Sequence, residues 1–270
     1  MPRLAVIGHP VGHSRSPAMQ TAALEALGLG EEWSYGAIDL APEELEARVR
    51  ELAVSGEYAG LNVTVPHKEA ALALADEASE AAREIGAANT LSFREGRILA
   101  ENTDAGGLIA SLPGGPAGRR ALVLGAGGAA RAAVWALARA GAVVFIWNRT
   151  AARAKSLADE FGAYVEIGGW PVDSPAEVDW GILVNTTTVG LGGEDPFEQL
   201  PLRRDEFAET VVVDMVYGDR PSRLLAAAEE AGALTVDGLE VLAQQGARSL
   251  RIWTGREPDL DVMRAAARRR

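Results

Sequence analysis

The sequence contains no cysteine and few histidines, which narrows the chemistry open to it. Without cysteine the chain forms no disulfide, no thiolate metal site and no cysteine nucleophile. The three histidines, His9, His13 and His67, never form the His-Glu-x-x-His pattern of zinc enzymes. The sequence therefore predicts a protein without a metal site.

Lysine and the side-chain amides are also scarce, and the few that remain are informative. Avoiding Asn, Gln, Met and Cys is typical of thermophilic proteins. Each remaining asparagine lies in a short polar segment of the kind that forms a site: Asn62, Asn89, Asn102, Asn148 and Asn185. The chain has only two lysines, Lys68 and Lys155. Because lysine can lose its proton and arginine cannot, Lys68, which follows an apolar segment, is the candidate for proton chemistry. Lys155, in a predicted exposed helix, shows that a lysine also remains without such a role.

Net charge and hydropathy restrict the partners. A formal net charge of -12 argues against nucleic acid or an anionic membrane as the main partner, although small anionic ligands remain possible. The first apolar run is too short for a signal peptide or a membrane span. We expect a cytoplasmic protein that acts on a small molecule, as a monomer or a homodimer.

Alternating apolar and amphipathic segments predict an α/β protein of two domains. In the first part we expect helices and strands as follows: strands at 3–8, 33–40, 60–65, 88–93 and 97–101, and helices at 16–28, 42–54, 67–85 and 104–112. Ser16 followed by Pro17 is typical of a helix N-cap and first turn. A Gly/Pro-rich loop at 113–118 precedes a new strand. The expected domains are 1–103 plus 238–270, and 104–237.

A glycine-rich turn in the second domain predicts a dinucleotide site of the Rossmann type. A strand at 121–125 is followed by a long Ala-rich helix and a second strand at 142–147. The spacing Gly125-x-Gly127-x-x-Ala130 matches the fingerprint that allows a tight turn, close approach of a pyrophosphate and helix–strand packing. The turn comprises Gly125, Ala126, Gly127, Gly128 and Ala129, and the helix that follows offers free N–H groups to phosphates.

The end of the second strand favours NADP over NAD. NAD sites usually carry an acidic residue there for the ribose 2′-hydroxyl. Here the strand is followed by Asn148, Arg149 and Thr150, with Arg153 one turn later. Two guanidinium groups at a helix start suit a 2′-phosphate. In an Arg-rich chain either arginine alone is also explained as a surface charge.

Further strand ends in this domain are candidate walls of the ligand crevice, because ligands of open α/β sheets lie at the carboxyl ends of the strands. The candidates are Thr187, Thr188, Met215 and Tyr217. Threonine-rich strand ends also make turns and helix caps, so a structural role stays open.

A hydride transfer to a carbonyl needs a group that gives a proton to the forming alkoxide. Lys68 and Asp104 can form such a pair, with the carboxylate stabilising the ammonium and orienting the hydroxyl.

These segments, taken in order over nearly the whole chain, resemble the shikimate dehydrogenase family. The resemblance lies in Ser14-Arg-Ser16-Pro17, Asn62-Val-Thr64-Val-Pro-His-Lys68, Gly86-Ala-Ala-Asn89-Thr, Asn102-Thr-Asp104, the glycine turn and Asn148-Arg-Thr150. Asn185-Thr-Thr-Thr-Val-Gly190 is a looser match to the family's segment at this position.

The resemblance implies NADPH-dependent reduction of 3-dehydroshikimate to shikimate in aromatic amino-acid biosynthesis. It implies catalysis by Lys68 and Asp104 and a carboxylate site at Ser14 and Ser16. The other substrate contacts it implies are Asn62, Thr64, Asn89, Tyr217 and Gln245, with Gln244 a competitor for the last position. Gly238, at the start of a long helix, completes the expected cofactor set.

Three alternatives stay open. A quinate/shikimate dehydrogenase shares these segments, and the absence of an acid at the second strand argues against NAD but not against quinate. A non-catalytic NADP-binding sensor would need no Lys–Asp pair. Another two-domain NADP dehydrogenase, such as one acting on a folate, fits the paired serines less well.

Overall fold

The computed structural model describes residues 1–162, 172, 174 and 178–269, and its chain divides into two compact units. Unit 1 comprises Met1–Gly107 and Leu242–Arg270, and unit 2 comprises Leu108–Val241. The divisions fall inside helices α5 (Asp104–Ser111) and α10 (Gly238–Thr254). The boundaries expected from the sequence, after residues 103 and 237, lie just before each of these helices begins. The predicted α/β class, with C-terminal helices that return to the first unit, is confirmed.

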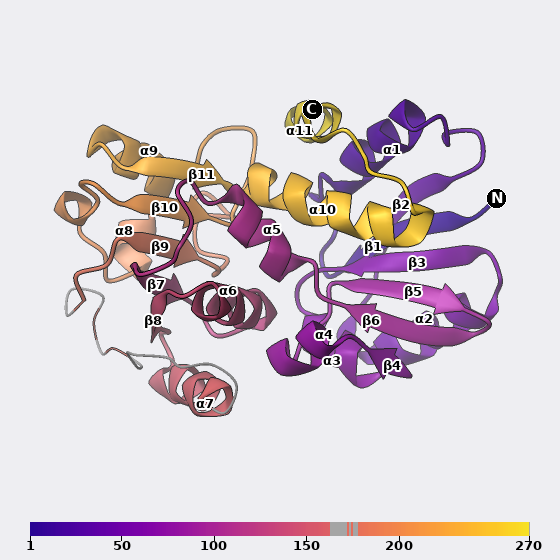
Figure 1. The fold of residues 1–270 in the computed structure, drawn as a ribbon, viewed down its shortest axis with the longest axis horizontal. Helices are drawn as coiled ribbons and strands as arrows, with labels where there is room; N and C mark the ends of the chain where they lie inside the picture. The colour runs from indigo at the N-terminus through magenta and orange to yellow at the C-terminus, as the bar shows by residue number, and fades with distance from the viewer. Residues whose placement is uncertain (163–171, 173, 175–177, 270) are drawn as a thin grey trace. The chain divides into compact units, whose positions relative to one another are not determined.

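Unit 1 is built on a six-stranded mixed sheet (Figure 1). Its order is β2-β1-β3-β5-β6-β4. The strands are β1 (Arg3–Gly8), β2 (Ser34–Asp39), β3 (Tyr58–Val63), β4 (Glu77–Ala78), β5 (Thr90–Arg94) and β6 (Arg97–Glu101). β1 runs parallel to both β2 and β3, whereas β5 is antiparallel to β3 and to β6. The strands predicted at 88–93 and 97–101 pair as a hairpin, and the two residues between β5 and β6, Glu95 and Gly96, have positive φ.

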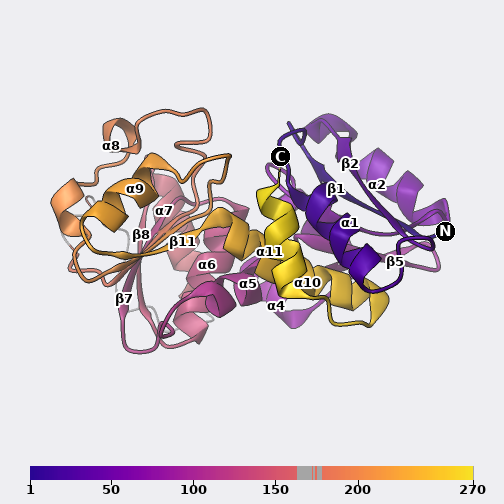
Figure 2. The same ribbon diagram turned by 90° about the horizontal axis from the view of Figure 1, so that it is seen from above.

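Helices cover the unit 1 sheet. After the short 3-10 turn η1 (Pro42–Glu44), α2 (Leu45–Val54) buries Leu45, Val49 and Leu52 in a core cluster with apolar side chains of β1, β3 and β5. Helices α1 (Ser16–Ala26) and α11 (Leu260–Arg268) pack side by side (Figure 2).

Helix α10 meets the unit 1 sheet at Gly60. A Cβ built there would lie 2.2 Å from Trp253 Nε1, and that nitrogen donates to Leu91 O at 3.1 Å. Glycine is therefore required at position 60, because any side chain would push α10 off the sheet.

The predicted continuous helix at 67–85 is wrong. The segment forms α3 (Lys68–Ala73), strand β4 and α4 (Glu80–Ile85). β4 pairs in parallel with Leu99 and Ala100 of β6, and Ser79 Oγ caps α4 by accepting the Ala82 N–H. Sheet pairing and a side-chain cap thus override the helical propensity of an Ala-rich segment.

Unit 2 is built on a parallel sheet whose order is β11-β10-β9-β7-β8. The strands are β7 (Arg120–Leu124), β8 (Val143–Trp147), β9 (Ile182–Asn185), β10 (Val211–Asp214) and β11 (Leu234–Asp237). Alternate strand residues enter two different cores, so both faces are buried, as parallel sheets require. Helices α6 (Gly128–Arg139) and α7 (Ala151–Phe161) cover one face and α9 (Arg223–Glu230) the other (Figure 1). The short helices α8 (Pro196–Gln199) and η3 (Arg204–Glu206) lie between β9 and β10 in sequence.

The direction of winding in unit 2 reverses between β7 and β9. From β7 the chain goes to β8 on one side, and then returns to β9 on the other. In open α/β sheets the ligand crevice lies at the carboxyl ends of strands at such a switch point.

Candidate active site

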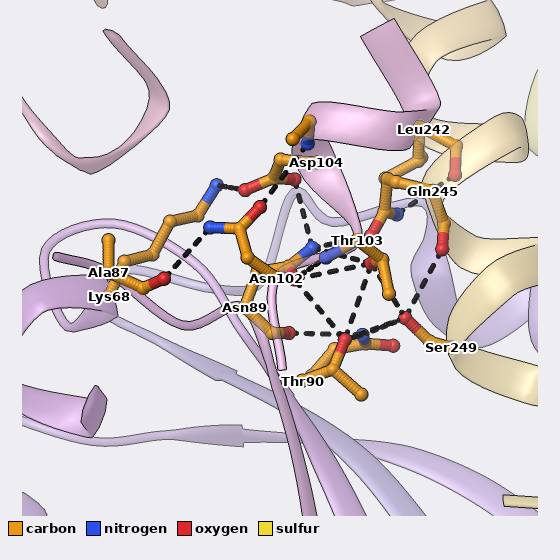
Figure 3. A network of polar contacts seen from close by, with 12 residues as sticks. Lys68, Ala87, Asn89, Thr90, Asn102, Thr103, Asp104, Leu242, Gln245 and Ser249 are labelled. Carbon is orange, nitrogen blue, oxygen red and sulfur yellow. Dashed lines mark hydrogen bonds and ion pairs between the residues drawn. The ribbon is translucent and has the colours of Figure 1, made fainter. Parts of the chain in front are cut away.

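Lys68 and Asp104 form an ion pair in unit 1 (Figure 3). Lys68 is the first residue of α3 and Asp104 the first of α5. Lys68 Nζ donates to Asp104 Oδ2 at 2.7 Å, and the two side chains are only 13% and 12% exposed. A partly solvated ammonium with one proton committed to a carboxylate has two more to offer to a ligand oxygen.

Asn89 holds the second oxygen of Asp104. Its Oδ1 accepts the Thr103 backbone N–H at 2.7 Å, which fixes the orientation of the amide. Its Nδ2 then lies 2.9 Å from Asp104 Oδ1, 2.9 Å from Thr103 Oγ1 and 3.0 Å from Gln245 Oε1. Two N–H groups face three acceptors, so Gln245 Oε1 can turn to a ligand hydroxyl without leaving Asn89 unpaired.

Gln245, and not Gln244, belongs to this network. Gln244 Oε1 instead accepts from Arg248 Nη1 at 3.2 Å on the same helix. Gln245 is brought close because Gly107 of α5 has no side chain: a Cβ there would lie 2.7 Å from Gln245 Cβ. The sequence left open whether Gln244 or Gln245 belongs to the site. The two lie on different faces of α10, and only the face of Gln245 is turned toward Asn89.

Asn62 lies behind Asn89 and is bonded throughout by protein groups. Its Oδ1 accepts from Tyr35 Oη at 2.7 Å, and its Nδ2 donates to Ser249 Oγ at 2.9 Å and Asn89 O at 3.2 Å. A buried amide bonded in this way supports its neighbours, and the expected substrate contact at Asn62 stays a prediction. Thr64, which follows β3, is half-buried and is not part of this network.

Of the paired serines, Ser14 lies in the loop between β1 and α1, and Ser16 lies where this loop meets the helix. Ser14 Oγ accepts the Ser16 N–H at 3.3 Å, and Arg15 rather than Ser16 is the N-cap, so the predicted cap at Ser16 is wrong. Ser16 is the first residue of α1, and the predicted first-turn proline follows it. Asp39 anchors the loop by accepting the Val11 N–H at 3.0 Å and pairing with His9 at 2.6 Å. The Val11 bond first, and then the His9 bond, lower the pKa of Asp39.

In unit 2 the glycine turn joins β7 to α6, and its glycines differ in purpose. Gly125 has φ +118, and a Cβ there would lie 2.5 Å from Thr186 Oγ1. At Gly127, the N-cap of α6, a Cβ would meet nothing within 4 Å. Packing thus requires glycine at position 125. Gly127 instead leaves open space at the N-terminus of α6, and this space fits a pyrophosphate. Ala126, Gly128 and Ala129 are half-buried, and Ala130 packs in the core.

Exposed cationic side chains stand at the start of α7. Thr150 is the N-cap and makes no side-chain cap, while Asn148 Nδ2 bonds Thr150 O at 2.9 Å. Arg149 and Arg153 are exposed, and within the described part of the chain neither has an ion-pair partner. Their position beside the end of β8 suits a phosphate on the ribose.

The ends of β9 and β10 are joined by Asn185 and Asp214. Asn185 Nδ2 donates to Asp214 Oδ1 at 2.9 Å, and Asn185 Oδ1 accepts the Thr187 hydroxyl at 2.7 Å. Asp214 also accepts from Ser222 Oγ at 2.5 Å and from the Val216 N–H at 3.1 Å. Burial raises the pKa of Asp214 to about 6 against the effect of these three bonds.

The other residues expected around the nicotinamide lie at the same strand ends of unit 2. Met215 and Tyr217 are half-buried in the segment after β10, and Thr188 is exposed after β9. At Gly238 a Cβ would lie 2.6 Å from Met215 O, which explains the glycine.

Several residues of these sites escaped the sequence prediction. Thr186, whose hydroxyl donates to Leu124 O at 2.7 Å, closes the switch point next to Gly125. Thr90, Thr103 and Ser249 form a buried hydroxyl cluster under Asn89. A serine on the apolar face of a helix is the signal that could have found Ser249.

A half-buried Lys–Asp pair in one α/β unit and a glycine turn at the switch point of another define a class, the two-unit dinucleotide-dependent dehydrogenases. Family models agree. The substrate-binding domain of shikimate dehydrogenase matches residues 6–91, shikimate / quinate 5-dehydrogenase matches 110–169, and the shikimate 5'-dehydrogenase C-terminal domain matches 238–268.

Individual relatives cover the full length. An NADP(+) shikimate dehydrogenase of Thermus thermophilus is 47% identical over 100% of this chain and 98% of its own. The shikimate dehydrogenase structure from Aquifex aeolicus superposes with a TM-score of 0.90 at 39% identity, covering 100% of this chain and 98% of that one. A Thermus thermophilus shikimate 5-dehydrogenase in complex with NADP(H) and shikimate gives a TM-score of 0.84 at 44% identity, covering 99% of each chain. The chain belongs to the shikimate dehydrogenase family.

Proposed function

We propose that this protein catalyses the NADPH-dependent, reversible reduction of 3-dehydroshikimate to shikimate in aromatic amino-acid biosynthesis. The observation that carries the proposal is the network in which Lys68, Asp104, Asn89 and Gln245 converge from four chain segments. A polyhydroxylated ring needs neutral donors and acceptors beside the group that moves the proton, and this network supplies both.

Lys68 is the proton donor of the reduction. NADPH, when bound, supplies the hydride to the carbonyl carbon. Lys68 Nζ gives a proton to the oxygen, so the ketone becomes an alcohol, and in the oxidation the amine takes that proton back. Asp104 has one oxygen on Lys68 and the other on Asn89, which holds the carboxylate in place and directs the ammonium.

The other substrate contacts follow from where their side chains lie. Ser14 Oγ accepts a backbone N–H and still has its own proton to donate to the substrate carboxylate, with Ser16 beside it. Gln245, Asn89 and Thr64 bind ring hydroxyls, and the substrate contact expected at Tyr217 stays a prediction.

The residues of unit 2 fit NADP. The turn from Gly125 to Ala129 holds the pyrophosphate, because Gly127 leaves open space in front of the helix. The 2′-phosphate is bound by Arg149 and Arg153, with Asn148 and Thr150 lining the adenosine side. Thr187, Thr188, Met215 and Gly238 form the nicotinamide wall at the switch point.

A second candidate substrate is quinate, and the family model that names shikimate and quinate together favours it specifically. A non-catalytic NADP sensor is disfavoured by the geometry, because binding alone gives no reason for a half-buried Lys–Asp pair at 2.7 Å.

Initial rates with shikimate and with quinate, each with NADP and with NAD, test the proposal through the absorbance of the reduced nucleotide. The highest kcat/KM is expected for shikimate with NADP. Equal efficiency on quinate would move the specificity to both rings, and no turnover with any pair would favour the sensor.

Three further expectations remain proposals. We place the reaction in the cytoplasm, and we expect a monomer or a homodimer without a nucleic-acid or membrane partner, consistent with the net charge of -12. No helix among the described residues is long and apolar enough to cross a membrane. Within the same residues, no group of three or more His, Cys, Asp or Glu is placed to hold a metal ion.

A further inference from the structure

Three buried hydroxyl groups meet beneath the candidate active site of unit 1 (Figure 3). Thr90 Oγ1 lies 2.8 Å from Ser249 Oγ, Ser249 Oγ lies 3.0 Å from Thr103 Oγ1, and Thr103 Oγ1 lies 3.3 Å from Thr90 Oγ1. We call Thr90, Thr103 and Ser249 the hydroxyl triad. Its members are 0%, 5% and 0% exposed, so no bulk water competes for these bonds.

Each member of the hydroxyl triad lies next to one residue of the site. Thr90 follows Asn89 in the chain, Thr103 precedes Asp104, and Ser249 is one helical turn after Gln245 on the same face of α10. The triad therefore joins the starts of β5 and α5 to α10, which are the segments that supply Asn89, Asp104 and Gln245.

The triad is also tied into the sheet. Asn62 Nδ2 donates to Ser249 Oγ at 2.9 Å, and the Asn62 side-chain carbonyl accepts from Tyr35 Oη at 2.7 Å. Ser249 Oγ further bonds the carbonyl of Gln245 at 3.2 Å. A satisfied buried network of this kind fixes one geometry, because any displacement leaves a polar group unpaired.

We infer that the hydroxyl triad is the positioning element of the substrate site, and that Ser249 is a positioning residue that acts through Thr90 and Thr103 on Asn89 and Asp104. Without the Ser249 hydroxyl, Asn62 and both threonines lose a partner, and the spacing of Asn89, Asp104 and Gln245 is no longer held. Substrate binding and proton transfer both depend on that spacing. This inference rests on the proposed function for the identity of the substrate.

Steady-state kinetics with shikimate and NADP test the inference. Ser249→Ala is expected to lower kcat/KM for shikimate on the order of tenfold, with the KM for NADP within about twofold of wild type. Thr254→Ala is the matched control on α10, because the Thr254 hydroxyl donates to Leu250 O at 2.8 Å and accepts the Arg256 N–H at 3.2 Å, both at its own helix end. It should keep the wild-type kcat/KM.

A second pair of variants separates the hydroxyl from the packing. Thr103→Val removes the hydroxyl and nearly keeps the shape, so it should match the loss in Ser249→Ala, whereas Thr103→Ser keeps the hydroxyl and should stay within about threefold of wild type. In a double-mutant cycle the losses from Ser249→Ala and Thr103→Val should be clearly less than additive, because both break one network.

A merely structural triad gives a different pattern. Ser249→Ala and Thr103→Val would then lower the melting temperature while the folded enzyme kept the wild-type KM for shikimate and kcat, and this would overturn the inference. The wild type tests the proposed function by itself, because absence of shikimate turnover in the wild type would contradict that function. If the wild type is active and Ser249→Ala has the same kcat/KM for shikimate, only the role given to the hydroxyl triad is contradicted.

Discussion

Asp104 Oδ2 accepts a hydrogen bond from Lys68 Nζ at 2.7 Å, and the two side chains form a half-buried ion pair although 36 positions separate them in sequence. α3 and α5 each begin at a member of the pair, so the register of both helix starts determines whether it forms.

Replacing Lys68 tests whether the pair moves a proton. Lys68→Met should lower kcat by roughly 100-fold to 10,000-fold, because the alkoxide loses its proton donor. Lys68→Arg keeps the positive charge but cannot release a proton at neutral pH, so it should be nearly as slow. The NADP Kd, measured by fluorescence titration, should stay close to wild type in both. An arginine variant with near-normal kcat would leave Lys68 only an electrostatic role.

The glycine turn offers a paired test of packing and binding. Gly125→Ala should lower the free energy of unfolding by about 1–3 kcal/mol, because it combines φ +118 with a Cβ 2.5 Å from Thr186 Oγ1. Gly127→Ala should stay within about 1 kcal/mol of wild type, since its Cβ would meet no protein atom within 4 Å. The second variant should nevertheless raise the KM for NADP, because the methyl occupies the space expected for the pyrophosphate. Unchanged NADP binding in Gly127→Ala would place the phosphates elsewhere.

Arg149 should determine the preference for NADP. Arg149→Ala removes a guanidinium at the start of α7, so the KM for NADPH should rise about tenfold while the KM for NADH changes little. Lys155→Ala, on the same helix, is the control: Lys155 pairs with Asp159 at 2.8 Å and should not affect either nucleotide. If the ratio of the two KM values is the same in wild type and Arg149→Ala, Arg149 does not bind the 2′-phosphate.

Asp214 should make the stability of the protein depend on pH. Burial raises its pKa from 3.8 to about 6, so the unfolded carboxyl ionises more readily than the folded one. Its stabilising contribution is complete below pH 3.8 and is lost as the pH rises through about 6. The wild type should therefore lose about 3 kcal/mol of unfolding free energy relative to the Asp214→Asn variant over this rise in pH. Urea denaturation of both proteins at several pH values measures the difference, and a constant difference would contradict the raised pKa.

Much of the fold was predictable because its signals are local. Apolar runs with turn signals correctly predicted β1, β2, β7 and β8, and the glycine spacing correctly predicted the start of α6. The segment at 67–85 was not predictable in this way, because β4 is stabilised by pairing with Leu99 and Ala100, which are distant in sequence. The N-cap at Ser16 failed because Ser14 Oγ accepts the N–H that opens the turn.

The asparagines show what the sequence reveals about a site and what it does not. Their scarcity correctly indicated constrained positions: Asn62, Asn89, Asn102 and Asn185 are buried and bonded. Scarcity did not distinguish a residue that faces a ligand from one that supports it. Asn62 and Asn185 bond protein groups on both sides of the amide, and only the structure shows those partners.

Unit 1 is discontinuous in the chain, and this affects the order in which the protein can fold during synthesis. Unit 2 is one continuous stretch, Leu108–Val241, whereas Gln245 and Ser249 lie in the stretch that follows it. Domains fold as units while translation proceeds from the N-terminus. The growing chain can therefore complete the glycine-turn unit first. The Lys68–Asp104 network gains its last members, Gln245 and Ser249, only after the unit 2 segment has been made.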